Sequence, residues 1–394
     1  MKITRIMQAI TMAGLVAAGT ASVQAEEVIK VGMIAPFSGA FAHYGKQMEN
    51  GMKAYMKLHG DTVAGKKIEI LLRDTTGPVP QLAKRLAQEL VVRDKVHFMV
   101  GFGFTPEALA VAPVAQAAKV PMIVMNAAAA GLTGKSDYMV RVAQSLQTVA
   151  SPMAAWALKN NIRKVVTLVS DYSPGIDSET AFINTFTAGG GQVLEKLRVP
   201  VTSPDFAPYI QRIKDAKPDA MFVFLPGAEQ GMSMLKSYRG RGLEEAGIKL
   251  IAVGNLTDDH TLPSMGNDAL GIITSFHYSI AHKSPENTAF LKAYADANPG
   301  AGRADYLALG GYDGMAAVYE VVRKLNGNVD GEKSIAVLKG MKLNSPRGPV
   351  TIDARSGDMV QNIYIRRVEK VAGELMNVEF EKFNSADFEK SAKP

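Results

Sequence analysis

The chain has 394 residues, of which 47% are hydrophobic and 21% charged, and this is the composition of an ordinary globular protein. It contains no cysteine, so a disulfide scaffold, a thiolate metal site, a cysteine nucleophile and a lipid anchor on cysteine are all excluded. The formal net charge of +6 comes from dispersed lysines and arginines, and we therefore expect no nucleic-acid partner.

The first 25 residues have the pattern of a signal peptide. Lys2 and Arg5 supply a positive start, and residues 6–18 form an apolar stretch too short to span a bilayer. Val23 and Ala25 then stand at the positions that a signal peptidase reads. No later stretch approaches the roughly 20 apolar residues of a membrane-spanning helix. The pattern predicts export, cleavage of residues 1–25 and a protein free in the periplasm.

The mature chain alternates short apolar runs with amphipathic segments. Residues 28–35 form a β-branched run that ends at Pro36, and residues 42–58 place Met48, Met52 and Met56 along one helical face. The next elements are predicted strands at 67–72, 96–100 and 121–125 and helices at 79–93 and 106–119. Strands that alternate with helices of this length indicate parallel βαβ units.

A second series of the same kind begins near residue 146. Its predicted strands are 164–169, 192–199, 220–225 and 249–253, and its helices are 151–160, 177–188, 206–215 and 228–238. After residue 278 we predict helices at 286–297 and 308–325, then antiparallel strands at 350–352 and 361–368 around the turn 353–358. Because about 369 mature residues exceed what one core usually serves, we expect two α/β lobes. With no low-complexity linker, the lobes are expected to share crossing strands that form a hinge.

The sequence lacks the motifs of a cofactor-dependent or metal-dependent enzyme. Gly101-Phe102-Gly103 follows a strand, but Pro106 stands where a dinucleotide fingerprint needs its third glycine. The six histidines show no i, i+4 pair, and Asp258-Asp259-His260 is interpreted as a solvated turn rather than a metal site. We therefore expect no enzyme activity, no cofactor and no metal.

Residues 105–107 predict a helix start that favours an anion. Thr105 is expected to cap the helix with its hydroxyl, Pro106 suits the first turn, and Glu107 lies in that turn. The free N–H groups of such a helix start favour a carboxylate.

Several short motifs occur in the order and spacing of one known family. They are residues 29–32, 36–39, 44–45, 121–124, 127–130, 132–133, 138–141, 171–175, 205–206 and 311–313. In these motifs the chain resembles the periplasmic solute-binding proteins of the leucine/isoleucine/valine-binding type, which deliver ligands to ATP-driven importers. The resemblance implies the type I fold, with two Rossmann-like lobes joined by three crossings. It places lobe 1 at 27–145 and 278–345, lobe 2 at 146–277 and 346–385, and a tail at 386–394.

The resemblance also implies a ligand site between the lobes, where lobe 1 loops grip a carboxylate through N–H groups and hydroxyls. The candidate ligand-binding residues are Tyr44, Phe102, Phe104, Thr105, Ala127, Ala128, Ala129, Tyr172, Pro226, Leu256, His277 and Tyr278. For Phe102 and Phe104 the alternative is that one of them packs beneath its loop.

The ligand class depends on the residue that would hold an ammonium group. Branched-chain amino-acid binders place a glutamate there, and the best-matching residue of this chain is Leu256. A buried ammonium without a partner is costly, so we expect an aromatic or apolar carboxylate without an amino group. If the alignment shifts by two, Asp258 or Asp259 takes the role of the glutamate and the ligand is a branched-chain or other apolar amino acid.

We therefore expect the substrate-binding component of an ABC importer. It is expected to be a monomer that closes by hinge motion around one small ligand and is recognised by an inner-membrane permease. A ligand-sensing domain that acts with a signalling partner is the alternative that the same fold allows.

Overall fold

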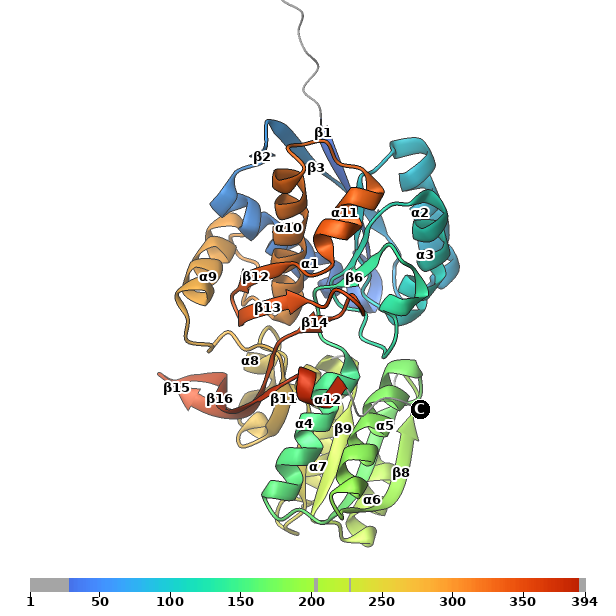
Figure 1. The fold of residues 1–394 in the computed structure, drawn as a ribbon. Helices are drawn as coiled ribbons and strands as arrows, with labels where there is room; N and C mark the ends of the chain where they lie inside the picture. The colour runs from blue at the N-terminus through green and yellow to red at the C-terminus, as the bar shows by residue number, and fades with distance from the viewer. Residues whose placement is uncertain (1–27, 202–204, 227, 390–394) are drawn as a thin grey trace, which may run out of the picture.

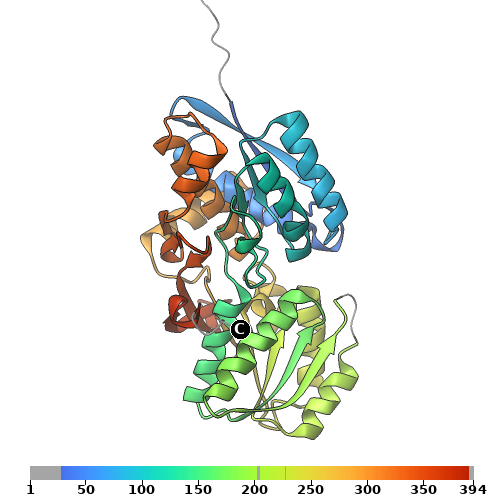
Figure 2. The same ribbon diagram turned by 45° about the vertical axis from the view of Figure 1, so that its right-hand side comes forward.

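The computed structural model describes residues 28–201, 205–226 and 228–389, and within them the chain forms two α/β lobes. Figure 1 shows one lobe above the other, and Figure 2 shows the chain segments that run between them. The predicted signal peptide, residues 1–25, and the last five residues of the predicted tail lie outside the described residues. Among the described residues, no helix is long and apolar enough to cross a membrane.

Lobe 1 is built on a six-stranded sheet of order β2-β3-β1-β4-β5-β6. Its strands are β1 (Val28–Ala35), β2 (Thr62–Val63), β3 (Lys66–Asp74), β4 (Phe98–Gly101), β5 (Met122–Val124) and β6 (Met139–Arg141). All neighbours are parallel except β2 and β3, which form an antiparallel hairpin. The last five residues of β1 are buried, as expected for a central strand covered on both faces.

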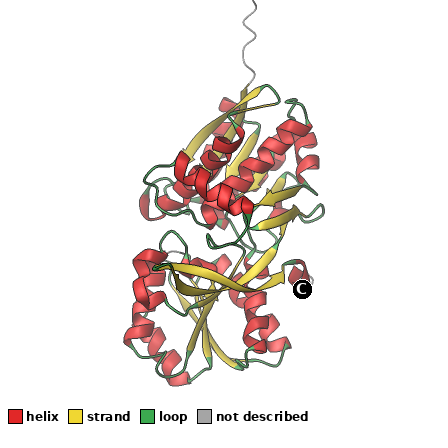
Figure 3. Cartoon of the chain, turned by 90° about the vertical axis from the view of Figure 1, so that its left-hand side faces the viewer, coloured by secondary structure: helices red, strands yellow, loops and turns green. Residues whose placement is uncertain are grey.

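The helices of lobe 1 cover both faces of this sheet (Figure 3). They are α1 (Ala42–His59), α2 (Pro80–Glu89), α3 (Thr105–Ala118), α9 (Pro285–Ala297), α10 (Tyr306–Lys324) and α11 (Gly331–Leu338). Glycines bring α1 and α10 into close contact, since a Cβ on Gly311 would stand 1.9 Å from the carbonyl oxygen of Met48. The helix pair therefore requires glycine at this crossing.

Lobe 2 contains a seven-stranded sheet of order β16-β15-β11-β10-β9-β7-β8. Its strands are β7 (Lys164–Ser170), β8 (Gln192–Val199), β9 (Ala220–Phe224), β10 (Lys249–Val253), β11 (Ile273–Phe276), β15 (Asn362–Val371) and β16 (Glu374–Asn384). The first five are parallel, whereas β15 pairs antiparallel with both β11 and β16. The helices associated with it are α4 (Leu146–Lys159), α5 (Ser173–Ala188), α6 (Ala207–Ala216), α7 (Ala228–Gly240), α8 (Leu262–Met265) and α12 (Ala386–Glu389).

A third, small sheet consists of β12 (Lys342–Ser345), β13 (Gly348–Ile352) and β14 (Met359–Val360). The predicted pairing of 350–352 with 361–368 was wrong, because β13 pairs with β14 and β15 joins the lobe 2 sheet. In the lobe 2 sheet, Ile363 and Ile365 of β15 are buried. A two-stranded hairpin would have left one of its faces, and the apolar side chains on it, exposed to water. The predicted lobe 2 segment 346–385 therefore begins with strands of the small sheet.

The chain passes between the lobes three times, between β6 and α4, between β11 and α9, and at Gln361 between β14 and β15. The fully buried Arg347 connects two of these crossings, since it donates to the Val142 carbonyl at 2.5 Å and to Gln361 Oε1 at 2.7 Å. The same guanidinium pairs with Asp313 on α10 at 2.6 Å. The predicted fold, two α/β lobes joined by three crossings, is confirmed.

Candidate ligand-binding site

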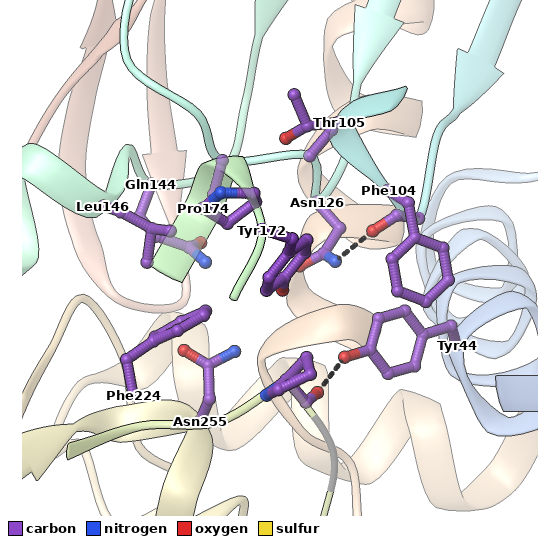
Figure 4. Close-up of a pocket in the computed structure, with 14 residues that line it drawn as sticks. Tyr44, Phe104, Thr105, Asn126, Gln144, Leu146, Tyr172, Pro174, Phe224 and Asn255 are labelled. Carbon is purple, nitrogen blue, oxygen red and sulfur yellow. Dashed lines mark hydrogen bonds between the residues drawn. The ribbon is translucent and has the colours of Figure 1, made fainter. Parts of the chain in front are cut away.

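A pocket lies between the lobes (Figure 4). Its walls come from residues that follow β4 and β5 in lobe 1 and β7, β9 and β10 in lobe 2. Ligands of open α/β sheets bind at such carboxyl ends of strands. The lining residues are Tyr44, Gly103, Phe104, Thr105, Asn126, Ala127, Ala128, Gln144, Leu146, Tyr172, Pro174, Phe224, Pro226 and Asn255. The predicted residues Tyr44, Phe104, Thr105, Ala127, Ala128, Tyr172 and Pro226 are thus brought together.

Thr105 lies at the start of α3, but it does not cap the helix. The N-cap is Phe104, which has extended backbone angles, and its N–H donates to Glu107 Oε2 at 3.2 Å. The predicted capping role of the Thr105 hydroxyl was therefore wrong. Its oxygen instead accepts the Ala129 N–H at 3.3 Å, and the hydroxyl hydrogen has no acceptor among the described residues. This hydrogen is available to a ligand anion.

The loop of residues 127–129 is held from behind by Arg141. This fully buried side chain donates to the carbonyls of Ala127 at 3.2 Å and Ala129 at 2.9 Å, and it pairs with Asp358 at 2.7 Å. Within the part of the chain that the structure describes, the backbone N–H of Ala128 donates to no protein acceptor. Thr105 and Ala128 therefore offer two free donors on the lobe 1 side of the pocket.

Aromatic rings form the apolar walls of the pocket. Tyr44 stacks on Phe104 with ring centroids 5.2 Å apart, and Tyr172 stacks on Phe224 at 6.3 Å. The Tyr44 hydroxyl donates to the carbonyl of Pro226 in the opposite lobe. Because burial holds the pKa of Tyr44 well above its ordinary value, this hydroxyl keeps its proton. The space between the lobes thus suits a flat apolar body.

Further contacts hold the lobes together around the pocket. The Ala130 N–H donates to Asp177 at 3.1 Å, and Arg303 pairs with Glu374 at 2.7 Å. Asn255 of lobe 2 donates to the Tyr306 hydroxyl of lobe 1 at 3.1 Å. The structure therefore shows the lobes in a closed arrangement.

Three amides in the pocket were not among the predicted residues. Asn126 follows β5 and donates to the Gly103 carbonyl at 2.7 Å, and Asn255 follows β10. Gln144 lies in the first crossing, and its Oε1 atom is buried without a hydrogen-bond partner. Asn126 and Asn255 could have been predicted as pocket residues, because each follows the end of a predicted strand. No motif in the sequence marks Gln144. The other unpredicted lining residues are Gly103, Leu146, Pro174 and Phe224.

Five predicted residues do not line the pocket. Phe102 has a positive φ of 66°, which turns its ring into the core beneath the loop, and Leu256 is buried in the core of lobe 2. His277 packs beside Phe276 and Tyr306, and burial lowers its pKa well below the ordinary value. Tyr278 donates to Asn287 at 2.8 Å, and Ala129 supports the loop through its N–H to Thr105 and its carbonyl to Arg141.

Asp258 and Asp259, the alternative ammonium partners, also lie outside the pocket lining. Asp258 accepts the His260 N–H at 2.7 Å, and Asp259 accepts from Asn377 at 2.7 Å and from the Ile280 N–H at 3.2 Å. Burial raises the pKa of Asp259 to about 6. None of the described residues that line the pocket is acidic. Nor do the described residues contain a group of three or more His, Asp or Glu side chains that could hold a metal ion.

The chain belongs to the periplasmic binding protein family, whose model matches residues 28–373. The Leu/Ile/Val-binding protein homolog 6 of Brucella melitensis is 42% identical over 364 residues, which are 92% of this chain and 93% of that protein. The family resemblance predicted from the sequence motifs is thereby confirmed.

Two similar solved structures are solute-binding proteins of ABC transporters from Rhodopseudomonas palustris. The protein from strain BisB5, in complex with 3,4-dihydroxybenzoic acid, is 51% identical with a TM-score of 0.87, over 91% of this chain and 98% of that one. The protein from strain HaA2, in complex with p-hydroxybenzoic acid, is 43% identical with a TM-score of 0.89 over the same shares. This protein is accordingly a substrate-binding protein of an ABC transporter and not an enzyme.

Proposed function

We propose that the protein captures an aromatic carboxylate in the periplasm and presents it to the permease of an importer. One observation carries the proposal. The pocket combines free donors at Thr105 and Ala128 with stacked aromatic walls, and none of its described lining residues is acidic. The donors suit a carboxylate, and the walls suit an aromatic ring.

An amino acid fits this pocket less well. Its ammonium group would be buried with no carboxylate beside it, because Asp258 and Asp259 are engaged by their own hydrogen bonds. An unpaired buried ammonium costs several kcal/mol after relaxation, which is at least a hundredfold in affinity. The similar proteins support both ligand classes. The Brucella protein is named as a Leu/Ile/Val-binding homolog, whereas the two Rhodopseudomonas structures hold hydroxybenzoic acids.

The site of action and the partners are part of the same proposal. The positive start, apolar stretch and small residues of the first 25 positions support export and cleavage after Ala25. The protein acts there as a monomer, and the closed form is the one that the permease recognises. N-terminal sequencing of protein from the periplasmic fraction tests the cleavage, and Glu26 is the expected first residue.

Calorimetry and thermal unfolding with benzoate, 4-hydroxybenzoate and leucine test the ligand class. The protein should first be unfolded, dialysed and refolded to remove any ligand carried through purification. An aromatic acid at 100 times its Kd is expected to stabilise the folded protein by about 2.7 kcal/mol. Leucine at the same concentration should give a much smaller shift. Submicromolar leucine binding without a response to either aromatic acid would refute the proposal.

A further inference from the structure

We propose that Asn255 is a specificity-determining residue, whose side-chain oxygen accepts a hydrogen bond from a hydroxyl on the ring of the bound aromatic acid. The inference rests on the proposed function and adds to it a requirement on the ligand. An acid with a ring hydroxyl should be preferred to an acid of the same shape without one.

The first step is the orientation of the Asn255 amide, which its contact with the other lobe determines. Its Nδ2 atom donates to the Tyr306 hydroxyl of lobe 1 at 3.1 Å. At the same end of the pocket the Tyr44 hydroxyl donates to the Pro226 carbonyl, so the lobes are joined here by a second contact. With its nitrogen engaged by Tyr306, the amide presents its oxygen to the pocket.

The second step concerns the amide oxygen. Asn255 lines the pocket, and its Oδ1 atom is buried with no hydrogen-bond partner among the described residues. A buried acceptor left without a donor is costly, and a site built to bind a hydroxyl rejects ligands that lack it. Figure 4 shows Asn255 and Thr105 at opposite ends of the pocket view. A ligand with its carboxylate at Thr105 can therefore direct a hydroxyl on its ring toward Asn255.

The third step distinguishes Asn255 from Gln144, whose Oε1 is also buried without a partner. Within the described chain, no protein hydrogen bond holds either end of the Gln144 amide, so this amide can rotate to offer a donor or an acceptor. Asn255 cannot do so while Tyr306 holds its nitrogen. Asn255 belongs to lobe 2 and Tyr306 to lobe 1, so the acceptor is oriented only when the lobes close.

Calorimetry on the unmodified protein provides the first test. Its ligands are 3- and 4-hydroxybenzoate and the corresponding methylbenzoates, which have similar shape but no hydroxyl donor. At least one hydroxy acid should bind about 5- to 150-fold more tightly than its methyl counterpart, as expected for satisfying one buried acceptor. Equal binding of every matched pair would overturn the role of Asn255 but leave the proposed function standing. Failure of all four acids to bind would refute the proposed function itself.

Two variants then assign the acceptor. Asn255→Leu keeps the approximate shape and removes the oxygen, so the ratio of hydroxy to methyl affinities should fall toward one while the methyl acids still bind. Gln144→Leu is the matched control and should retain the ratio. If the ratio survives in Asn255→Leu, or is lost in Gln144→Leu instead, the assignment is wrong. Should Asn255→Leu fail to fold by circular dichroism, the ligand pairs on the unmodified protein and on Gln144→Leu still decide the question.

Discussion

At the scale of single residues, Thr105 and Leu256 show how differently two predicted site residues are placed. Thr105 lies on the pocket wall with a free hydroxyl hydrogen, although it is almost fully buried. Leu256 has 1% of its surface exposed and belongs to the core of lobe 2. The neighbouring Asn255 reaches the pocket in its place.

Replacing Thr105 by valine keeps the volume and removes the hydroxyl. The affinity for 4-hydroxybenzoate is expected to fall by about 1.5–3 kcal/mol, the range for hydrogen bonds to charged groups. Calorimetry measures the change. Thr133→Val is the control, because Thr133 is a buried threonine of the same lobe that does not line the pocket. An unchanged Kd in Thr105→Val would show that the hydroxyl does not bind the carboxylate.

Leu256→Glu places a carboxylate in the core of lobe 2. We expect the free energy of unfolding to fall by several kcal/mol, since this charge has no partner in an apolar cluster. Urea unfolding measures the loss, and Leu256→Met should cost less than about 1.5 kcal/mol because it conserves volume. A Leu256→Glu protein that is as stable as the parent and binds leucine would instead support the ligand role inferred from the family alignment.

At the scale of elements, buried ionisable side chains hold the loops that follow two of the parallel strands. Glu107 is fully buried at the start of α3 and accepts the Phe104 N–H, and burial raises its pKa to about 7. Arg141 comes from the end of β6 and holds the carbonyls of the 127–129 loop. These contacts hold the backbone of the loops that line the pocket.

Arg141→Met should weaken both the fold and the ligand site. The free energy of unfolding is expected to fall by roughly 1.5–3 kcal/mol, because charge-assisted hydrogen bonds to two carbonyls are lost. The affinity for 4-hydroxybenzoate should fall as well, since the loop is no longer held. Urea unfolding and calorimetry measure the two effects, with the exposed Arg355→Met in the nearby turn as the control. Lower stability with an unchanged Kd would show that Arg141 serves the fold alone.

At the scale of the whole molecule, several contacts join the two lobes across the pocket. Tyr44 bonds to Pro226, Asn255 bonds to Tyr306, and Arg303 pairs with Glu374, each pair joining one residue from each lobe. All the crossings are short, and Arg347 holds two of them together. Such an arrangement favours a hinge rotation of rigid lobes over internal rearrangement.

The ligand-free protein is expected to be less compact than the ligand-bound protein. Small-angle scattering should show a smaller radius of gyration with saturating 4-hydroxybenzoate, because ligand shifts the population toward the closed form. Acetate at the same concentration is the control and should leave the radius unchanged. Calorimetry should first verify that the ligand binds. Equal radii of gyration with and without that ligand would then argue against hinge closure.

The sequence by itself determined the two series of βαβ units. The predicted bounds of β1, β8 and β10 match the structure, since burial periodicity and turn residues are local properties. The family resemblance of its motifs named the loops around the pocket, in agreement with the rule that ligands of open α/β sheets bind at the carboxyl ends of strands. Thr105 was predicted from its helix-start motif and from the resemblance, and Tyr172 from the resemblance, and both line the pocket.

Only the tertiary structure decided which of two neighbouring side chains lines the pocket. The positive φ of Phe102 turns that ring into the core and leaves Phe104 on the pocket wall, and the turn after β10 exposes Asn255 while it buries Leu256. The pairing of β15 with β11 could not be predicted from the sequence either, since it joins residues about 90 positions apart. Both outcomes depend on packing between distant segments, which neither periodicity nor motif spacing records.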